Sequence, residues 1–297
     1  MGHHHNHHHT KGNIKTAFFL NLAFTIIEII GGFYTNSLAI MSDAVHDLGD
    51  SLSLGMSWYF QKLSNKDANK KYSYGYGRFS LLGAIINSIV LIVGSFFIIS
   101  AAIPRIINPE EANATGMMWL AILGIIVNGA AVLKLNKGSS INERVVSLHL
   151  LEDVLGWFAV LIASIVMQYW DVPILDPILS LAIAGYVLFN VYRNIKDAFK
   201  IILQGVPNEV SSDEIKKQIM LHIDEVENIH DCHIWTLDGE YHIATIHITI
   251  RNKEFSWQKS KEVKQKIKKL LHDNFKLEHV TLELESISED CGYINCN

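Results

Sequence analysis

The sequence predicts a membrane-embedded, all-α bundle of six transmembrane helices followed by a cytoplasmic α+β domain with the element order α-β-β-α-β. Two observations support this prediction. Apolar runs near or above the length that crosses a bilayer fill the chain from Thr16 to about Asn194, whereas the stretch from Gln204 to Asn297 is rich in Lys, Asp and Glu. The overall composition, 49% hydrophobic and 19% charged, therefore averages two different halves.

The lengths of the apolar runs predict the six helices, and the charges around them predict their orientation. The helices are expected at about Thr16–Tyr34, Leu38–Phe60, Phe79–Ala102, Met117–Leu135, Val145–Tyr169 and Ile174–Tyr192. Basic residues gather in the loops on one side of the membrane, while the opposite loops carry only Arg105. By the positive-inside rule, we expect both termini in the cytoplasm and several crossings of the plasma (inner) membrane.

We expect three parts in the chain: a His-rich tail over residues 1–13, a transmembrane domain over 14–203 and a cytoplasmic domain over 204–297. The tail is either a purification tag or a native segment that gathers metal, and both alternatives stay open. Its histidines are His3, His4, His5, His7, His8 and His9. The formal charge of -5 and the scattered basic residues exclude a nucleic-acid surface. Three cysteines are too few for a disulfide-stapled domain and indicate a reducing compartment.

Two of the expected helices carry ionisable residues, each of which costs roughly 2.5 to 3.5 kcal/mol at the centre of a membrane. The second helix places His46 and Asp50 four residues apart, and the fifth repeats this spacing with His149 and Asp153. Residues four apart lie on one face of a helix. If the two faces meet, two imidazole nitrogens and two carboxylate oxygens form the tetrahedral set that zinc accepts.

A single pair of this kind on a soluble helix is usually an ordinary surface pair, but a spanning helix lacks the solvated face that such a pair needs. Two copies on two spanning helices therefore predict a metal site. Asp43 shares the face of His46 and is expected behind the ligands or on the access path, unless it caps its helix. On the first helix, Asn21 and Glu28 face the same way and serve either the ion pathway or a structural hydrogen bond.

The polar C-terminal part shows a second pattern of elements. The expected elements are a helix from a capping box at Ser211–Glu214 to about Ile223, strands over Ile229–Leu237 and Tyr241–Ile250 around an Asp238-Gly239 turn, a Lys-rich helix over about Ser256–Asn274 and a last strand over Val280–Ile287. This order of elements gives the expected α+β domain.

Several motifs, in this order and spacing, resemble the cation diffusion facilitator family, in particular its zinc-exporting branch. They are Asn36-Ser-Leu-Ala39 leading into Ser42-Asp-Ala-Val-His46-Asp-Leu-Gly-Asp50, Tyr74-Gly-Tyr-Gly-Arg78, His149-Leu-Leu-Glu-Asp153, Asp176-Pro177 and His230-Asp-Cys-His-Ile-Trp235. The resemblance implies a homodimer with a ferredoxin-like cytoplasmic domain that exports Zn2+ in exchange for protons by alternating access. It also implies that His46, Asp50, His149 and Asp153 carry the ion, with His46 typical of the zinc-preferring version.

The same resemblance implies a regulatory metal site in the cytoplasmic domain. His230, His247, Glu283 and Glu285 match positions at which relatives bind metal between subunits, and His233 is a further candidate. Cys291 and Cys296 either clip a metal or are free thiols of the C-terminal tail. Some relatives bind metal in the loop between the second and third helices, but residues 63–77 contain no histidine, so we expect no site there.

Three other functions are compatible with these ligands: export of Cd, Co, Ni, Mn or Fe, an intramembrane zinc enzyme, and a metal sensor that does not transport. A catalytic zinc keeps an open coordination position, whereas four protein ligands close the site. The sequence therefore favours a carried ion over a catalytic one.

Overall fold

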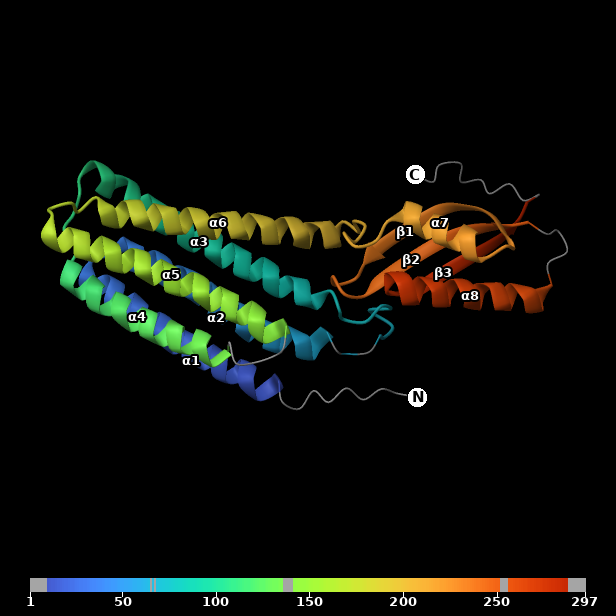
Figure 1. Ribbon diagram of the computed structural model, residues 1–297, viewed down its shortest axis with the longest axis horizontal. Coiled ribbons are helices and arrows are strands. Elements are labelled where there is room, and N and C mark those ends of the chain that lie inside the picture. Colours follow the sequence, from blue (N-terminus) through green and yellow to red (C-terminus); the bar gives the residue numbers. More distant parts are fainter. Residues whose placement is uncertain (1–9, 65, 67, 136–140, 252–255, 288–297) are drawn as a thin grey trace. The chain divides into compact units, whose positions relative to one another are not determined.

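The computed structural model describes residues 10–64, 66, 68–135, 141–251 and 256–287, and it divides into two compact units. The first comprises Met1–Leu63 and Leu82–Ile195, and the second comprises Ser64–Leu81 and Lys196–Asn297. The first unit is made of long helices, and the second contains a sheet with two shorter helices (Figure 1). The segment that joins the second and third helices thus belongs to the unit that holds the sheet.

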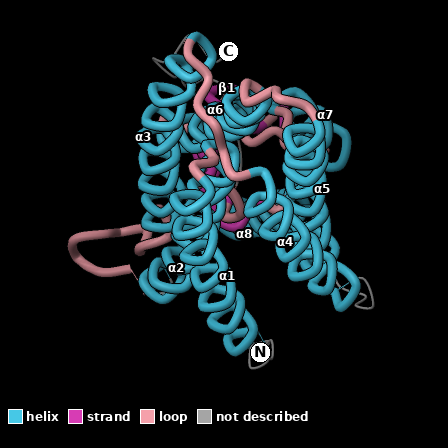
Figure 2. Tube along the Cα trace, turned by 90° about the vertical axis from the view of Figure 1, so that its left-hand side faces the viewer, coloured by secondary structure: helices cyan, strands magenta, loops and turns pink. Residues whose placement is uncertain are grey.

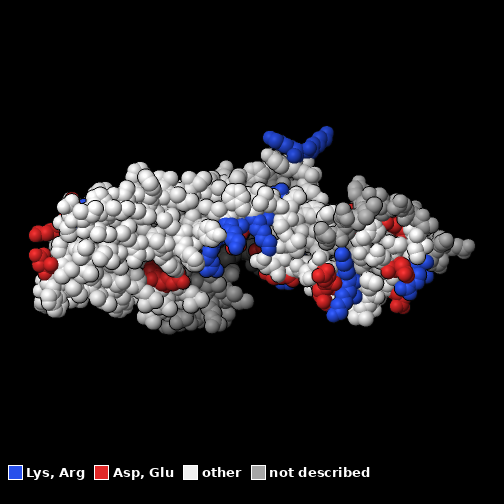
Figure 3. Space-filling model, turned by 90° about the horizontal axis from the view of Figure 1, so that it is seen from above, with Lys and Arg blue, Asp and Glu red and all other residues white. Residues whose placement is uncertain are grey.

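The first unit is built on six helices, as predicted. They are α1 Thr10–Thr35, α2 Leu38–Ser64, α3 Phe79–Ile107, α4 Ala114–Leu135, α5 Ile141–Tyr169 and α6 Leu175–Ile202. Among the described residues, all of these except α2 are long and apolar enough to cross a membrane. The α2 helix has 27 residues but carries three aspartates, which lower its hydropathy. On the face shown in Figure 3, charged side chains are sparse over most of this unit.

The site-bearing helix α5 is held by close packing against α4 and α1. Trp157 of α5 is almost completely buried against Gly124 of α4, where an added Cβ would come within 2.3 Å of the indole. Phe24 of α1 meets the same indole edge-on, with ring centroids 6.0 Å apart. Figures 1 and 2 both show α4 lying alongside α5. A side chain at Gly124 would therefore push apart the helices that position one half of the metal site.

The other site-bearing helix, α2, is capped by a residue of α6. The Asp176 carboxylate accepts hydrogen bonds from the Ser37 hydroxyl at 2.5 Å, from the Leu38 N–H at 2.8 Å and from the Ala39 N–H at 3.2 Å. These N–H groups belong to the first turn of α2 and have no partner within their own helix. A carboxylate at this end also complements the helix dipole. Asp176 therefore accepts the hydrogen bonds of the free donors and fixes the start of α2 to α6.

The second unit contains the predicted α-β-β-α-β order, which is confirmed. Its elements are α7 Ser212–His222, β1 Val226–Thr236, β2 His242–Ile250, α8 Trp257–Phe275 and β3 Leu277–Ser286. The three strands form a sheet in the order β1-β2-β3, in which β2 is antiparallel to β1 and parallel to β3. Gly239 closes the β1–β2 hairpin at φ +104, a conformation that glycine adopts without strain.

One face of this sheet is covered by the two helices and the other carries the polar side chains. Ile219 of α7 and Ile267 of α8 are completely buried against the core residues Ile246 and Ile248 of β2. Because side chains alternate along a strand, His247 lies on the opposite face. The sheet therefore presents His247 on the face that the helices leave uncovered.

The two helices of this unit begin differently. Ser256 caps α8 by accepting a hydrogen bond from the Lys259 N–H, as serine does at many helix starts. At α7 the predicted capping box is wrong, because the Ser211 side chain makes no capping bond. Glu214, its expected partner, instead accepts a hydrogen bond from Gln218 one turn later.

Candidate metal centres

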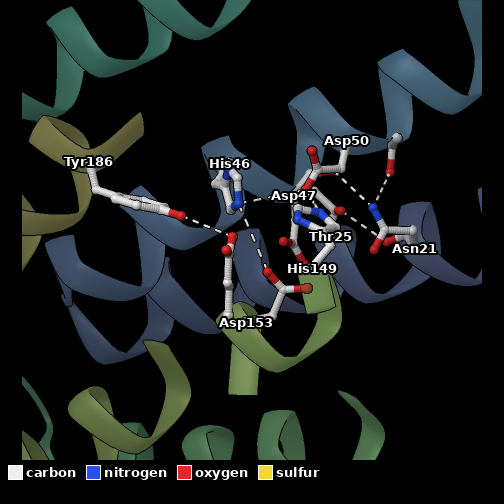
Figure 4. A network of polar contacts seen from close by, with 10 residues as sticks. Asn21, Thr25, His46, Asp47, Asp50, His149, Asp153 and Tyr186 are labelled. Atoms are coloured by element: carbon white, nitrogen blue, oxygen red, sulfur yellow. Dashed lines mark hydrogen bonds and ion pairs between the residues drawn. The ribbon is translucent and has the colours of Figure 1, made fainter. Parts of the chain in front are cut away.

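The structure brings together all four predicted ligands of α2 and α5 (Figure 4). His149 Nε2 lies 2.9 Å from Asp50 Oδ2, and His46 Nε2 lies 3.7 Å from the same oxygen and 3.9 Å from Asp153 Oδ1. The imidazole rings of His46 and His149 have centroids 5.8 Å apart. The ligand atoms of His46, Asp50 and His149 all lie within 4.8 Å of one another. Asp153 joins this group through its contact with His46.

These separations fit a tetrahedral ion. Zinc bonds of about 2.0 to 2.2 Å in a tetrahedron place neighbouring ligand atoms about 3.3 to 3.6 Å apart. The distances from Asp50 Oδ2 to His149 Nε2 and to His46 Nε2, 2.9 and 3.7 Å, lie on either side of this range. An ion held by all four side chains would replace the hydrogen bond between His149 and Asp50 with two metal bonds, and it would draw Asp153 toward the other three ligands.

The four ligand side chains differ in exposure in a consistent direction. On α2, Asp50 is 26% exposed and His46 17% exposed. On α5, His149 is 40% exposed and Asp153 10% exposed. In each pair, the ligand nearer the C-terminal end of α2 and the N-terminal end of α5 is the more exposed one. The protein therefore covers the ligands less fully at that end of the bundle.

A second group of polar residues lies buried beside the ligands. Glu28 of α1 is 1% exposed, and neither of its carboxyl oxygens has a hydrogen-bond donor among the described residues. Asp43 and Asp47 of α2 are also buried. Asn21 of α1 donates to the Asp47 carbonyl and to the Ser51 hydroxyl, both at 3.1 Å. Asn21 thus ties α1 to the ligand-bearing part of α2.

Two further acidic residues lie on the ligand-bearing helices, Asp43 on α2 and Glu152 on α5. Asp43 lies inside α2, which begins at Leu38, so the alternative that it caps its helix is wrong. Glu152 of α5 accepts a hydrogen bond from the Tyr186 hydroxyl of α6 at 2.9 Å. The sequence pattern does not reveal Tyr186, because its contact joins two helices and follows no local spacing.

The second cluster lies on the uncovered face of the C-terminal sheet. Glu285 of β3 lies between two histidines, 2.6 Å from His247 Nδ1 and 3.0 Å from His230 Nε2. His230 and His247 are cross-strand neighbours on β1 and β2, with ring centroids 5.5 Å apart. Their nitrogens and the Glu285 oxygens are close enough to share an ion.

The other candidates of this domain lie around that cluster. Glu283 Oε2 is 3.4 Å from His247 Nε2, but the side chain is largely exposed. His233 lies outside the compact group and pairs with Asp231 at 2.9 Å. The sequence analysis missed Asp231, which lies 3.5 Å from His247 Nε2. The histidine tract at residues 3–9, Cys291 and Cys296 lie outside the described residues.

A β-bulge explains the position of Asp231. The register of β1 against β2 shifts between His230 and His233, so that Asp231 is an extra residue with φ +46. A bulge of this kind redirects a side chain that strict alternation would place on the other face. As a result, Asp231 joins His230 and His247 on the uncovered face, while Cys232 lies in the core.

Comparison with known proteins matches both parts of the chain to one family. Residues 14–203 match the family model of the cation efflux transmembrane domain, and residues 207–287 match that of the cation efflux protein cytoplasmic domain. The chain belongs to the cation diffusion facilitator family. The family consists of metal cation efflux transporters and antiporters rather than enzymes, and the chain is a multi-pass membrane protein of this kind.

Three relatives match along nearly their whole length. The chain is 33% identical to the cadmium, cobalt and zinc/H(+)-K(+) antiporter of Bacillus subtilis, over 96% of this chain and 92% of that protein. It is 33% identical to the metal cation efflux system protein CzcD of Cupriavidus metallidurans, over 96% and 90% of the two chains. It is 32% identical to the zinc transporter ZitB of Pectobacterium atrosepticum, over 95% and 88%. The zinc-type branch of the family is therefore the one to which this chain is similar.

Proposed function

We propose that the protein exports zinc from the cytoplasm in exchange for protons, and that it carries the ion on His46, Asp50, His149 and Asp153. The convergence of these four side chains from α2 and α5 is the observation that supports the proposal. Two imidazoles and two carboxylates match zinc, and a bound dication offsets the burial of two negative charges in the membrane. The relatives named as transporters of zinc, cadmium and cobalt support the same ligand class.

Proton exchange follows from the chemistry of the ligands. Zinc binds neutral imidazole and ionised carboxylate, so binding expels protons and protonation weakens the site. If the site opens alternately to each side, zinc leaves where protons are abundant, and the protonated site returns. The proposal includes both termini in the cytoplasm and a location in the plasma membrane, so that export removes zinc from the cell.

Zinc flux into proteoliposomes with an imposed pH gradient tests the proposal. We expect the gradient to accelerate zinc flux and zinc to drive proton movement in the opposite direction. The variants His46→Ala and Asp153→Ala should each abolish flux while the protein still folds, and Asp197→Ala, an exposed acid of α6, is the matched control. Zinc flux that is indifferent to the gradient contradicts proton coupling, and cadmium or cobalt flux far above zinc flux contradicts the choice of metal.

A second proposal concerns the C-terminal domain, which we propose binds regulatory metal in a homodimer. The observation behind it is that His230, His247 and Glu285 lie together on the sheet face that the two helices leave uncovered. Metal shared there would close the dimer when cytosolic zinc rises. Calorimetric zinc titration with a parallel measurement of dimer affinity tests this role, and zinc binding that leaves dimer affinity unchanged contradicts it.

A further inference from the structure

A buried set of hydrogen bonds joins the start of α2 to the start of α6. It consists of Asp176 with Ser37, Leu38 and Ala39, and one turn further along, of the Ser42 hydroxyl donating to the Ser180 carbonyl at 3.3 Å. We call this set the α2–α6 clasp. Every member is buried, and Asp176 is 1% exposed. The clasp joins two segments that are 137 to 139 residues apart in the chain.

The clasp lies at the closed end of the metal site. Residues 37–40 at the start of α2 are all buried, as are Ser42 and Asp43, whereas residues 52–56 beyond the ligands are partly exposed. On α5, the clasp lies toward the C-terminal end, because α6 begins at Leu175, shortly after α5 ends at Tyr169. In both ligand pairs, the residue nearer the clasp, His46 or Asp153, is the less exposed one. The protein thus covers the site more fully at the end that carries the clasp than at the opposite end.

We propose that the α2–α6 clasp is the extracytoplasmic gate of the transporter, and that Asp176 holds it shut in the inward-open state. The inference rests on the proposed function for its orientation, because both termini in the cytoplasm place the start of α2 and the start of α6 on the outer side. Metal then enters from the cytoplasm, and it leaves outward only after Asp176 releases the first turn of α2.

The chemistry of the clasp suits two discrete states. The hydroxyl of Ser37 and the N–H groups of Leu38 and Ala39 need acceptors in either state, since the first turn of a helix leaves its donors unpaired. In the closed state they bond a buried carboxylate, and hydrogen bonds to a charged acceptor are among the stronger ones. In the open state, water accepts the hydrogen bonds from the donors of α2, and other water molecules solvate the Asp176 carboxylate of α6. Both states therefore satisfy the same groups, and closure depends on one side chain.

A reversible cross-link tests whether the clasp must open. In a background with Cys232, Cys291 and Cys296 replaced by Ser, the pair Ser37→Cys and Asp176→Cys is oxidised in proteoliposomes and then reduced. We expect the oxidised protein to lose zinc flux yet bind zinc from the cytoplasmic side, and reduction to restore flux. The control pair is Gly31→Cys and Leu120→Cys, which joins α1 to α4, where the Gly31 Cβ position lies 3.4 Å from Leu120 Cγ.

The possible results of the cross-link separate the two proposals. Loss of flux in the Ser37/Asp176 pair with flux retained in the control pair supports the gate. Full flux through the cross-linked pair overturns it. If the shorter cysteine side chains do not form the disulfide, thiol labelling from outside decides the question. Absence of zinc flux in the unmodified protein contradicts the proposed function, and thiol labelling from outside then still tests the gate.

Thiol labelling from outside tests the gate without any flux. Ser180, whose carbonyl is part of the clasp, is completely buried, so Ser180→Cys in the cysteine-free background should be protected from a membrane-impermeant thiol reagent added outside intact cells. Adding Asp176→Asn removes the charge and one acceptor, and we expect labelling to become at least tenfold faster. Adding Asp171→Asn instead, a change in the loop before α6, should leave the rate unchanged. Equal labelling rates with and without Asp176→Asn overturn the proposal.

Discussion

The two metal clusters use the same kinds of side chain but balance their charges differently. In the C-terminal sheet, Glu285 lies within hydrogen-bonding distance of His247 and beside His230, so its buried carboxylate already has histidine partners. In the membrane unit, Glu28, Asp43 and Asp47 are buried close to the ligands, and no Lys or Arg ion pair with any of them occurs among the described residues. The buried carboxylate of the sheet cluster lies against its own histidines, whereas the buried carboxylates beside the membrane site need an ion or protons.

This difference indicates how each cluster should respond to metal. A cluster whose buried carboxylate already has histidine partners can fold first and bind metal later, which suits a regulatory site. A cluster of buried carboxylates that lacks cationic partners changes its charge whenever an ion or proton enters or leaves, which suits a carrier. The following predictions test this distinction, beginning with the largest expected effect.

Asp50→Ala should cause the largest change, because Asp50 Oδ2 faces both His46 and His149. Structural zinc sites with four ligands contribute about 10 to 16 kcal/mol, or about 3 kcal/mol per ligand, so we expect zinc affinity at the membrane site to fall more than about 100-fold. Equilibrium zinc binding by the purified protein measures this loss. If Asp50→Ala binds zinc as well as the control Asp197→Ala, Asp50 is not a ligand of the membrane site.

Glu285→Gln should weaken metal binding only in the C-terminal domain. Loss of the carboxylate removes the group between His230 and His247, and we expect that site to lose about 10- to 100-fold in zinc affinity. Flux at saturating zinc should change little, because the membrane ligands are intact. Glu278→Gln, on the same strand but outside the cluster, is the control. Abolished flux in Glu285→Gln would show that the two clusters are not separable.

Glu28→Gln should be tolerated, in contrast to a change at Asp50. The Glu28 oxygens are buried without a donor, and an amide at this position gains N–H groups that can donate to a neighbouring carboxylate. We expect zinc binding to persist and the free energy of unfolding to stay equal or rise by about 1 kcal/mol. Thermal unfolding and zinc titration of the same preparation measure both. If Glu28→Gln loses zinc binding as Asp50→Ala does, Glu28 belongs with the ligands.

Ser256→Ala should produce the smallest effect and should not depend on metal. The Ser256 hydroxyl caps α8, so its loss should cost about 1 kcal/mol of local stability. Ser211→Ala is the matched control, because Ser211 makes no capping bond at α7. Hydrogen exchange of α8 in the full-length protein, with and without zinc, measures the difference. A cost that appears only without zinc would mean that metal, rather than the core, stabilises this domain.

Much of the fold and the centre of the membrane site could be predicted from the sequence, because both depend on local spacing. Apolar runs defined the six helices, and the four-residue spacing in α2 and α5 defined the ligands. Contacts between distant segments were not predictable in this way. Asp176 was noted only as part of a motif, since its hydrogen bonds reach α2 across the bundle. Asp231 was missed because a bulge, rather than alternation, directs its side chain.

The polarity of α2 also has a consequence for how the protein is made. Its three aspartates lie in the part of the helix that crosses the membrane, and each costs about 2.5 to 3.5 kcal/mol to insert alone. The partner of Asp50 on α5, His149, follows 99 residues later in the chain, but Asn21 of α1 is synthesised before α2 and bonds Ser51 within it. We therefore expect α1 and α2 to enter the bilayer together as a hairpin, with α1 acting as the insertion partner until the rest of the carrier has been translated.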